Sequence, residues 1–328
     1  MGSGKTTLLN TLLKAASFAH TAVIVNEFGE IGLDHLLIAR GSDNVLLLEA
    51  GCLCCTIADS LHETLADLNF RKVRGEIPVF ERVIIETTGL ADPAPILNTL
   101  LGNRLVTDHY RLDSVVVTVD AQHALAGLDV HAEVAKQIAV ADRLVITKGD
   151  LAAPPDELIA RLDRLNPHAA RFHSRDPTAA LVAFAPGERH RLPKRFVPVH
   201  RHPDRQHFQR HDANIRADCF VLPQPPTWAG IAGWWRLVSE TFGDRMLRCK
   251  GLLEIADTGD IVFVQGVQRV FHSPERLPDW PDADHRSRLV CITRDVDEAE
   301  LRLTLRSFDA PAGTSPNLTL TDLQHGRN

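Results

Sequence analysis

The first half of the chain alternates short apolar runs with helical patterns, and this alternation limits the available folds more than any other feature. Runs rich in Val, Ile and Leu predict strands at 21–26, 45–48, 82–85, 114–119 and 143–147. They show little polar alternation, as expected of strands covered on both faces. Helical spacing follows in two places, at 57–68 and 156–165. The sequence therefore predicts an α/β fold with a mostly parallel, doubly wound sheet.

The second half has a different pattern. A stretch rich in Arg, His and Pro lacks periodicity around 186–214, and beyond it strands are predicted at 217–222, 251–256, 261–265 and 289–293 with helices at 228–242 and 296–305. That order predicts a smaller α+β domain. We expect a first domain over 1–190, a linker over 191–213, a second domain over 214–308 and a disordered tail over 309–328.

Length and composition exclude several classes of protein. A chain of 328 residues has room for about two domains, and its net charge of −6 argues against a general nucleic-acid binder. No apolar run approaches the roughly 20 residues needed to cross a bilayer, and no signal peptide is evident. Six cysteines in a chain this long do not form a disulfide framework. We therefore expect a cytoplasmic protein without nucleic-acid or membrane partners.

The N-terminus carries the end of a phosphate-binding loop. Gly4-Lys5-Thr6 matches the last part of G-x-x-x-x-G-K-[ST], and an amphipathic helix follows it. Lys5 would reach the β and γ phosphates, and the Thr6 hydroxyl would bind Mg²⁺. The other phosphate contacts would come from Gly2, Ser3, Gly4 and Thr7. The alternative is a helix that merely starts with Gly-Ser-Gly.

The first glycine of that pattern, and the strand that normally feeds the loop, would lie before Met1. We therefore expect a sheet that lacks its first strand, because of a misassigned start site or a fragment. If the chain starts at Met1, nucleotide affinity and stability should both suffer, since the loop geometry depends on that strand.

Two further motifs follow predicted strands, at the edge where open α/β sheets bind ligands. Glu86 ends one strand, and its carboxylate would hold Mg²⁺ or orient the attacking water. Gly89 would let a backbone N–H approach the γ-phosphate, so we expect Lys5, Glu86 and Gly89 to serve hydrolysis. The alternative is an ordinary acidic strand end before a glycine turn.

The second motif, Thr147-Lys148-Gly149-Asp150, fits the [N/T]-K-x-D pattern that reads guanine. The Asp150 carboxylate would accept hydrogen bonds from the ring N1–H and the exocyclic amine, which adenine cannot offer. Thr147 stands where Asn is commoner. Thr147, Lys148 and Asp150 are thus candidate nucleotide contacts, with a surface turn as the alternative.

Three thiols, those of Cys52, Cys54 and Cys55, lie between a predicted strand and a predicted helix. They could converge on one soft or borderline metal ion, and the positive end of the helix would lower their pKa values. Core packing and thiol redox chemistry are the alternatives. Three thiols leave a tetrahedral site one ligand short, which suits a metal that must be passed on.

Other candidate metal ligands are weaker. Glu27, Glu30 and Asp34 lie in the segment NEFGEIGLD, and Glu27 is the candidate for a fourth ligand or a Mg²⁺ contact. The linker histidines could bind a metal weakly, but the arginines among them favour a solvated linker; they are His200, His202, His207 and His211. The remaining cysteines and most tryptophans are expected to pack in cores; these are Cys219, Cys249, Cys291, Trp234, Trp235 and Trp280.

Together these motifs resemble the CobW family of P-loop GTP-dependent metallochaperones, a class that also contains nickel-delivery proteins. The resemblance rests on GSGKTTLLN, NEFGEIGLD, GCLCC, ETTGLADP and TKGD in the first half, and on KGLLEI, VFVQGVQRVFH and WPDADHRSRLVCITRD in the second. The chain departs from the family in its N-terminus and in the short histidine run of its linker.

The resemblance implies GTP hydrolysis, with Mg²⁺, coupled to delivery of a transition metal to a client protein. The metal is most often zinc and in some members cobalt, and the resemblance assigns it to Cys52, Cys54 and Cys55. A nucleotide-impaired metal-binding or storage module is the alternative, and a kinase is disfavoured because TKGD reads guanine. The sequence leaves open the metal, the client and the oligomeric state, with a homodimer as one option.

Overall fold

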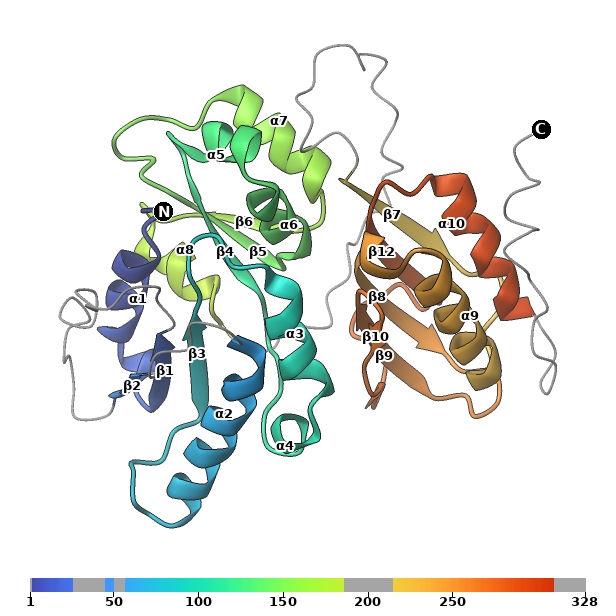
Figure 1. Ribbon diagram of the computed structural model, residues 1–328, viewed down its shortest axis with the longest axis horizontal. Coiled ribbons are helices and arrows are strands. Elements are labelled where there is room, and N and C mark those ends of the chain that lie inside the picture. The colour runs from blue at the N-terminus through green and yellow to red at the C-terminus, as the bar shows by residue number, and fades with distance from the viewer. Residues whose placement is uncertain (1, 26–44, 50–56, 186–214, 310–328) are drawn as a thin grey trace. The chain divides into compact units, whose positions relative to one another are not determined.

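The computed structural model describes residues 2–25, 45–49, 57–185 and 215–309 (Figure 1). The chain divides into two compact units, Met1–Ala160 with Ala169–Pro186, and Arg161–His168 with Gly187–Asn328. The predicted linker at 191–213 and the predicted tail beyond residue 309 lie outside the described residues. So do several candidate ligands, namely Cys52, Cys54, Cys55, Glu27, His200, His202, His207 and His211.

Among the described residues of the first unit, six parallel strands form two three-stranded sheets. The order is β2-β1-β3 in one sheet and β4-β5-β6 in the other. The bounds are β1 Thr21–Val25, β2 Val45–Glu49, β3 Arg82–Glu86, β4 Val116–Asp120, β5 Arg143–Thr147 and β6 Ala170–His173. The register aligns the last residues of paired strands, so Glu86 lies beside Val25 and Thr147 beside Asp120. The predicted α/β class with parallel strands is confirmed, and in the described ranges no ladder joins β3 to β4.

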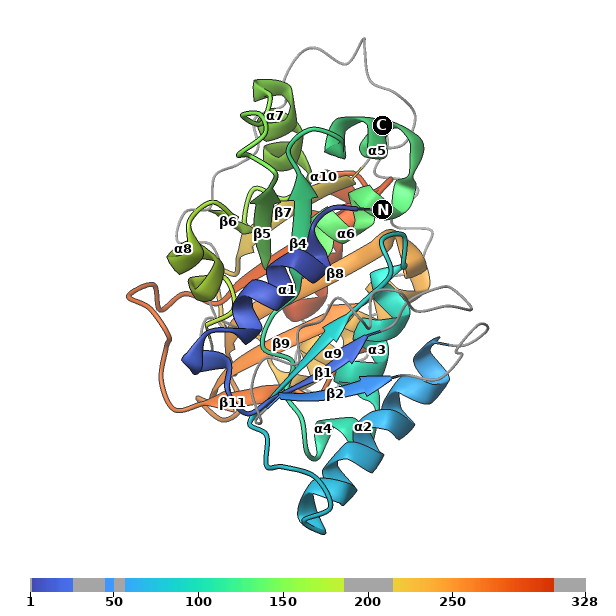
Figure 2. The same ribbon diagram turned by 90° about the vertical axis from the view of Figure 1, so that its left-hand side faces the viewer.

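The first helix, α1 (Lys5–Leu13), packs against both of these sheets. One core cluster joins Leu12 to Val145 of β5, and another joins Leu13 to Val23 of β1. Ile84 of β3 packs against both clusters. Figure 2 shows α1 lying across strands of the two sheets. The segment that begins with Gly4 and Lys5 is therefore fixed to the strands whose ends carry the other motifs.

Helices α2 (Ile57–Val73), α3 (Pro93–Gly102) and α4 (Arg104–Thr107) cover the other face of the β2-β1-β3 sheet. Their side chains Leu65, Ile96 and Val106 share a buried cluster with Ala22 and Ile24, which alternate along β1 with the residues that face α1. The apolar run of β1 is explained by this two-sided burial. The remaining helices are α5 Ala124–Val130, α6 Ala132–Val140, α7 Asp156–Leu165 and α8 Pro177–Val182.

The second unit is built on an antiparallel sheet of order β10-β9-β8-β12-β7, with β11 paired to β9. The strands are β7 Ile215–Val221, β8 Met246–Glu254, β9 Ile261–Val267, β10 Val270–Phe271, β11 Glu275–Leu277 and β12 Arg288–Arg294. The helices are α9 Trp228–Thr241, η3 Gly243–Arg245, α10 Glu298–Thr304 and η4 Leu305–Asp309. The predicted strand at 251–256 begins earlier, at Met246, and the short strands β10 and β11 were not predicted.

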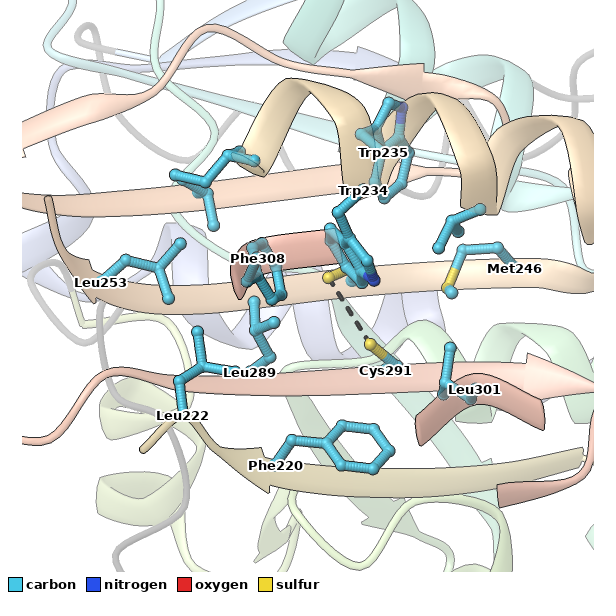
Figure 3. Close-up of a cluster of buried hydrophobic side chains, with 14 of the residues drawn as sticks. Phe220, Leu222, Trp234, Trp235, Met246, Leu253, Leu289, Cys291, Leu301 and Phe308 are labelled. Carbon is cyan, nitrogen blue, oxygen red and sulfur yellow. Dashed lines mark hydrogen bonds between the residues drawn. The ribbon is translucent and has the colours of Figure 1, made fainter. Parts of the chain in front are cut away.

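The core of this sheet lies under α9 (Figure 3). Trp234 and Trp235 of α9 pack with buried side chains of the sheet, including Cys249 and Cys291, whose sulfur atoms lie 3.7 Å apart. The prediction that these two cysteines pack in a core is confirmed, because both are fully buried. At Gly266 a Cβ atom would lie 2.3 Å from the ring of Trp235, so only glycine fits beneath this helix.

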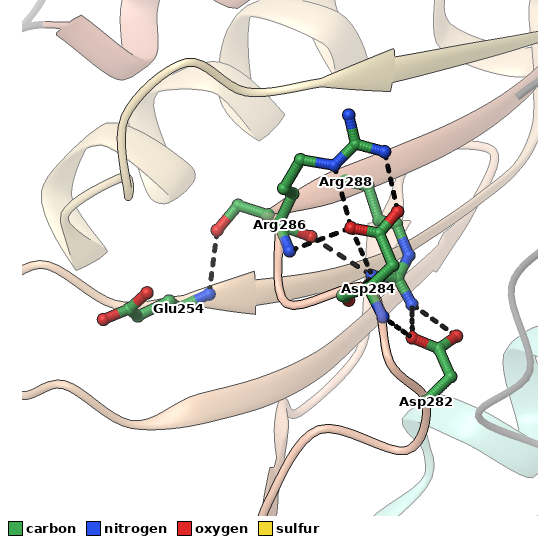
Figure 4. Close-up of polar contacts among 6 residues, drawn as sticks. Glu254, Asp282, Asp284, Arg286 and Arg288 are labelled. Atoms are coloured by element: carbon green, nitrogen blue, oxygen red, sulfur yellow. Dashed lines mark hydrogen bonds and ion pairs between the residues drawn. The ribbon is translucent and has the colours of Figure 1, made fainter. Parts of the chain in front are cut away.

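A buried arginine closes the loop that precedes β12 (Figure 4). Arg288 is 1% exposed and donates to both carboxylate oxygens of Asp282, at 2.8 and 2.7 Å. It also donates to the carbonyl oxygens of Asp284 and Arg286. Arg286 binds the Asp284 carboxylate from outside, and this hydrogen bond is the main reason that the pKa of Asp284 falls to about 2. Buried charge is tolerated here because it is paired.

Candidate nucleotide-binding site

The start of α1 has the backbone geometry of an anion-binding loop. Gly4 caps the helix with φ 83° and ψ 18°, and Gly2 has φ 75°, both in the left-handed region that glycine enters without strain. Lys5 is the first helical residue, and the first turn of α1 contains no acidic side chain. The free N–H groups and positive dipole of a helix N-terminus attract anions. The local structure is therefore suited to phosphate.

Thr6 and Glu86 bring together two candidate ligands of Mg²⁺. The Thr6 hydroxyl donates to a carboxylate oxygen of Glu86 across 2.9 Å, although the two residues are 80 positions apart in the chain. Glu86 is held there because it ends β3, next to the sheet core on which α1 packs. A hydroxyl and a carboxylate are the hard oxygen ligands that Mg²⁺ prefers, so these residues fit the ion.

The turn predicted to read guanine is bonded to the predicted phosphate loop. Thr147 ends β5, is 4% exposed, and donates from its hydroxyl to the Ser3 carbonyl oxygen across 2.7 Å. A Cβ atom on Gly4 would lie 3.5 Å from the Thr147 side chain, so the two segments touch. Ser3 is also linked to β4, since its hydroxyl lies 2.8 Å from that of Thr118. Thr147 thus connects the two segments through its side-chain hydroxyl.

Asp120 is a residue of this site that the sequence analysis missed. It ends β4, its side chain is 8% exposed, and its carboxylate lies 2.7 Å from the ammonium nitrogen of Lys148. The same carboxylate accepts hydrogen bonds from the backbone N–H groups of Gln122 and His123. Burial raises the pKa of Asp120, but its hydrogen bonds to Lys148, Gln122 and His123 outweigh burial and leave this pKa below the ordinary value.

The position of Asp120 at the end of an apolar run was the signal that could have identified it. Carboxyl ends of neighbouring parallel strands meet at one edge, so an acid ending β4 faces the turn that follows β5. Lys148 has φ 56°, a left-handed conformation that is uncommon outside glycine, and its side chain binds Asp120. Asp150, the expected guanine contact, lies in the same turn and is exposed.

The structure therefore joins the predicted phosphate, magnesium and guanine motifs through direct hydrogen bonds. Gly89 follows Glu86 in the loop that leads to α3. The predicted thiol site lies outside the described residues, as does Glu27. Across the described ranges, no group of three or more His, Cys, Asp or Glu side chains is placed to hold a metal ion. None of the described helices is both long and apolar enough to cross a membrane.

Comparison with known proteins matches each half of the chain to a domain of the CobW proteins. The model of the CobW/HypB/UreG nucleotide-binding domain matches residues 1–173, and that of the cobalamin synthesis protein cobW C-terminal domain matches residues 215–309. The chain is 32% identical over 303 residues to the zinc chaperone YjiA of Escherichia coli (strain K12), covering 92% of this chain and 94% of that protein. It is 27% identical to the zinc chaperone CobW of Sinorhizobium sp, covering 94% of each.

A crystal structure of Zn(II)-bound YjiA GTPase from E. coli has a similar fold. The TM-score is 0.65 at 26% sequence identity, and the match covers 94% of this chain and 96% of that one. The chain therefore belongs to the CobW/HypB/UreG family of P-loop GTPases, and it carries the C-terminal domain of the cobW proteins as well.

Proposed function

We propose that this protein is a GTP-hydrolysing metallochaperone that binds zinc through Cys52, Cys54 and Cys55 and transfers it to a client metalloprotein. The observation that supports the nucleotide half of this proposal is the 2.9 Å contact between the Thr6 hydroxyl and the Glu86 carboxylate at the start of α1. The metal half is supported by the C-x-C-C sequence and by relatives described as zinc chaperones.

Each residue of the site has a role that follows from its chemistry. Lys5, at the first turn of α1, would neutralise the β and γ phosphates. Thr6 and Glu86 would hold Mg²⁺, which supplies charge neutralisation on the transferring phosphoryl group. Gly89 would let the backbone approach the γ-phosphate, and Asp150 would accept from the guanine edge. Lys148, held by Asp120, would shape the guanine pocket.

The metal and the nucleotide would be coupled through loop order. The γ-phosphate and Mg²⁺ order the loops that touch them, and hydrolysis releases those loops. A thiol site whose geometry depends on such a loop would therefore bind zinc more tightly in one nucleotide state than in another. Zinc is the proposed cargo, and cobalt, which also accepts thiolate ligands, is the second candidate. Glu27 remains the proposed fourth ligand.

The experiment measures GTP turnover and zinc affinity on the full chain, using Lys5→Ala and Cys54→Ser as paired variants. We expect turnover that Lys5→Ala abolishes, and a zinc affinity that differs between the GTP, GDP and nucleotide-free forms. Cys54→Ser should weaken zinc binding while leaving GTP binding unchanged. Zinc binding without turnover above the Lys5→Ala level would favour a metal-binding or storage module instead.

A further inference from the structure

The loop between β3 and α3, residues 87–92, is held from one side by two neighbouring side chains of α6. The side-chain amide nitrogen of Gln137 donates to the carbonyl oxygens of Gly89 and Ala91, at 3.2 and 2.8 Å. The ammonium nitrogen of Lys136 lies 2.8 Å from the Asp92 carboxylate. These contacts attach the loop to α6, in addition to the hydrogen bonds that the loop makes within itself and at the start of α3.

Each contact constrains the loop backbone. An amide group has two N–H donors, and Gln137 uses its amide to bridge two carbonyls that are two residues apart. Asp92, which binds Lys136, also accepts from the backbone N–H of Ala94 and so caps α3. Lys136 and Asp92 are 18% and 35% exposed, so solvent weakens this ion pair. Gln137 differs from Lys136 in binding the loop backbone directly, at two carbonyl oxygens.

The position of this loop matters because it directly follows Glu86 and contains Gly89. Glu86 binds Thr6 at the expected magnesium site, and the Ala91 N–H donates to the Thr88 carbonyl oxygen, which closes a turn around Gly89. Gln137 binds two carbonyls of that turn and its end, those of Gly89 and Ala91. A shift of this turn would move the backbone that faces the γ-phosphate, and a displacement of about 1 Å can cost roughly 100-fold in rate.

We propose that Gln137 is a positioning residue for GTP hydrolysis, which sets the place of the Gly89 turn relative to the γ-phosphate by bridging the carbonyls of Gly89 and Ala91. The inference rests on the proposed GTPase function of this site. The described hydrogen bonds of Gln137 go to the loop backbone, so Gln137 would act through that backbone. Gln137 is therefore expected to affect hydrolysis and binding of GTP but not binding of GDP, because GDP has no γ-phosphate to contact this turn.

The test compares Gln137→Glu with Gln137→Met in the full chain. Glutamate has the same size but replaces the donor with an oxygen that the two carbonyls repel, and methionine fills the space without any donor. The matched control is Glu133→Gln on the same helix, since Glu133 makes no hydrogen bond or ion pair with residues 87–92 in the described structure. The measurements are kcat for GTP, and the Kd values of GDP and of a slowly hydrolysed GTP analogue.

We expect kcat to fall about 100-fold in Gln137→Glu and about tenfold in Gln137→Met, while the Kd of GDP stays within twofold. The ratio of the analogue Kd to the GDP Kd should rise in both variants, and Glu133→Gln should match the wild type. An unchanged kcat, or equal losses of kcat and GDP affinity, would overturn the proposal. If the wild type itself shows no turnover, the proposed function fails, yet the ratio of the two Kd values still tests the positioning role.

Discussion

Replacing Thr147 by valine removes the hydroxyl that joins the predicted guanine-reading turn to the predicted phosphate loop, and that also donates more weakly to the Val119 carbonyl oxygen across 3.3 Å. Valine has nearly the same shape as threonine but lacks the hydroxyl that donates to the Ser3 carbonyl oxygen across 2.7 Å. The site is almost fully buried at Thr147, which is 4% exposed, and half-buried at Ser3. The variant therefore removes a donor and leaves the acceptor only partly accessible to water.

The expected magnitude follows from that burial. An unsatisfied buried carbonyl costs about 1–3 kcal/mol, and partial access of water to Ser3 places the effect in the lower half of that range, about 1–2 kcal/mol. The same loss acts on ligand binding if the bond holds the two loops at the distance the nucleotide requires. Because about 1.4 kcal/mol corresponds to tenfold in affinity, the Kd of GDP should rise roughly tenfold.

Urea unfolding and titration with a fluorescent GDP derivative measure the two effects separately. Thr107→Val is a suitable control because Thr107 is an exposed residue of α4 in the same unit, and its replacement should change stability by less than about 0.5 kcal/mol. If Thr147→Val unfolds at the wild-type urea midpoint and binds GDP within twofold of the wild type, the hydroxyl does not hold the two loops together. The stabilising role assigned to the hydrogen bond between Thr147 and Ser3 would then be wrong.

Three further substitutions test other parts of the structure. Gly266→Ala should lower the free energy of unfolding by about 1–3 kcal/mol, and with it the urea midpoint, since the new methyl group would lie 2.3 Å from the Trp235 ring. A wild-type midpoint would mean that α9 can shift away from the sheet without cost. Asp120→Asn should cost about 2 kcal/mol at pH 7, because the Asp120 pKa is lowered and its contribution is present above the ordinary value of 3.8. The difference in free energy of unfolding between the variant and the wild type should shrink as the pH falls below 3.8 and through the lower pKa of folded Asp120. Urea unfolding curves at several pH values measure this difference, and a difference that does not change with pH would contradict the prediction. Tyr110→Phe should cost about 1 kcal/mol by removing the hydrogen bond to the Leu65 carbonyl; burial raises the Tyr110 pKa to about 12, so wild-type stability should fall as the pH rises from 10 towards 12, whereas a phenolate titration near 10 in the folded protein would contradict it.

Strands β1 to β5 could be predicted because each is an apolar run, which is a local property of the sequence. Strand β6 was missed because Ala170–His173 is short and carries Arg171 and His173, so it forms no apolar run. The phosphate, magnesium and guanine motifs stay predictions from short patterns, and the structure places them at the start of α1 and at the ends of β3 and β5. The prediction of a strand at 251–256 was displaced because β8 begins with Met246 and includes Arg248 and Lys250, charged residues whose place in the sheet depends on tertiary contacts. The two-residue strand β10 offers no periodicity at all.

The contacts between motifs could not be predicted from spacing. Asp120 and Lys148 meet because β4 and β5 are parallel and end at the same level, and nothing near Lys148 in the sequence points to Asp120. Gln137 lies on α6, a helix that the sequence analysis did not identify, and its partners Gly89 and Ala91 are backbone carbonyls without a sequence signature. Sequence patterns located the loops of the candidate site, and only the fold shows which side chains connect one loop to another.

These contacts divide the site into two parts with different connections. On the side expected to bind guanine, Thr147 holds Ser3 and Asp120 holds Lys148, so those loops are bound to one another and to the ends of β4 and β5. On the side expected to meet the γ-phosphate, Thr6 contacts Glu86, and the loop after Glu86 is bound to α6 and leads into α3. If the proposed site is correct, loss of the γ-phosphate would remove a ligand from the second part alone. The loop at 87–92 and its contacts with α6 would then respond to hydrolysis, while the first part would keep its contacts with GDP.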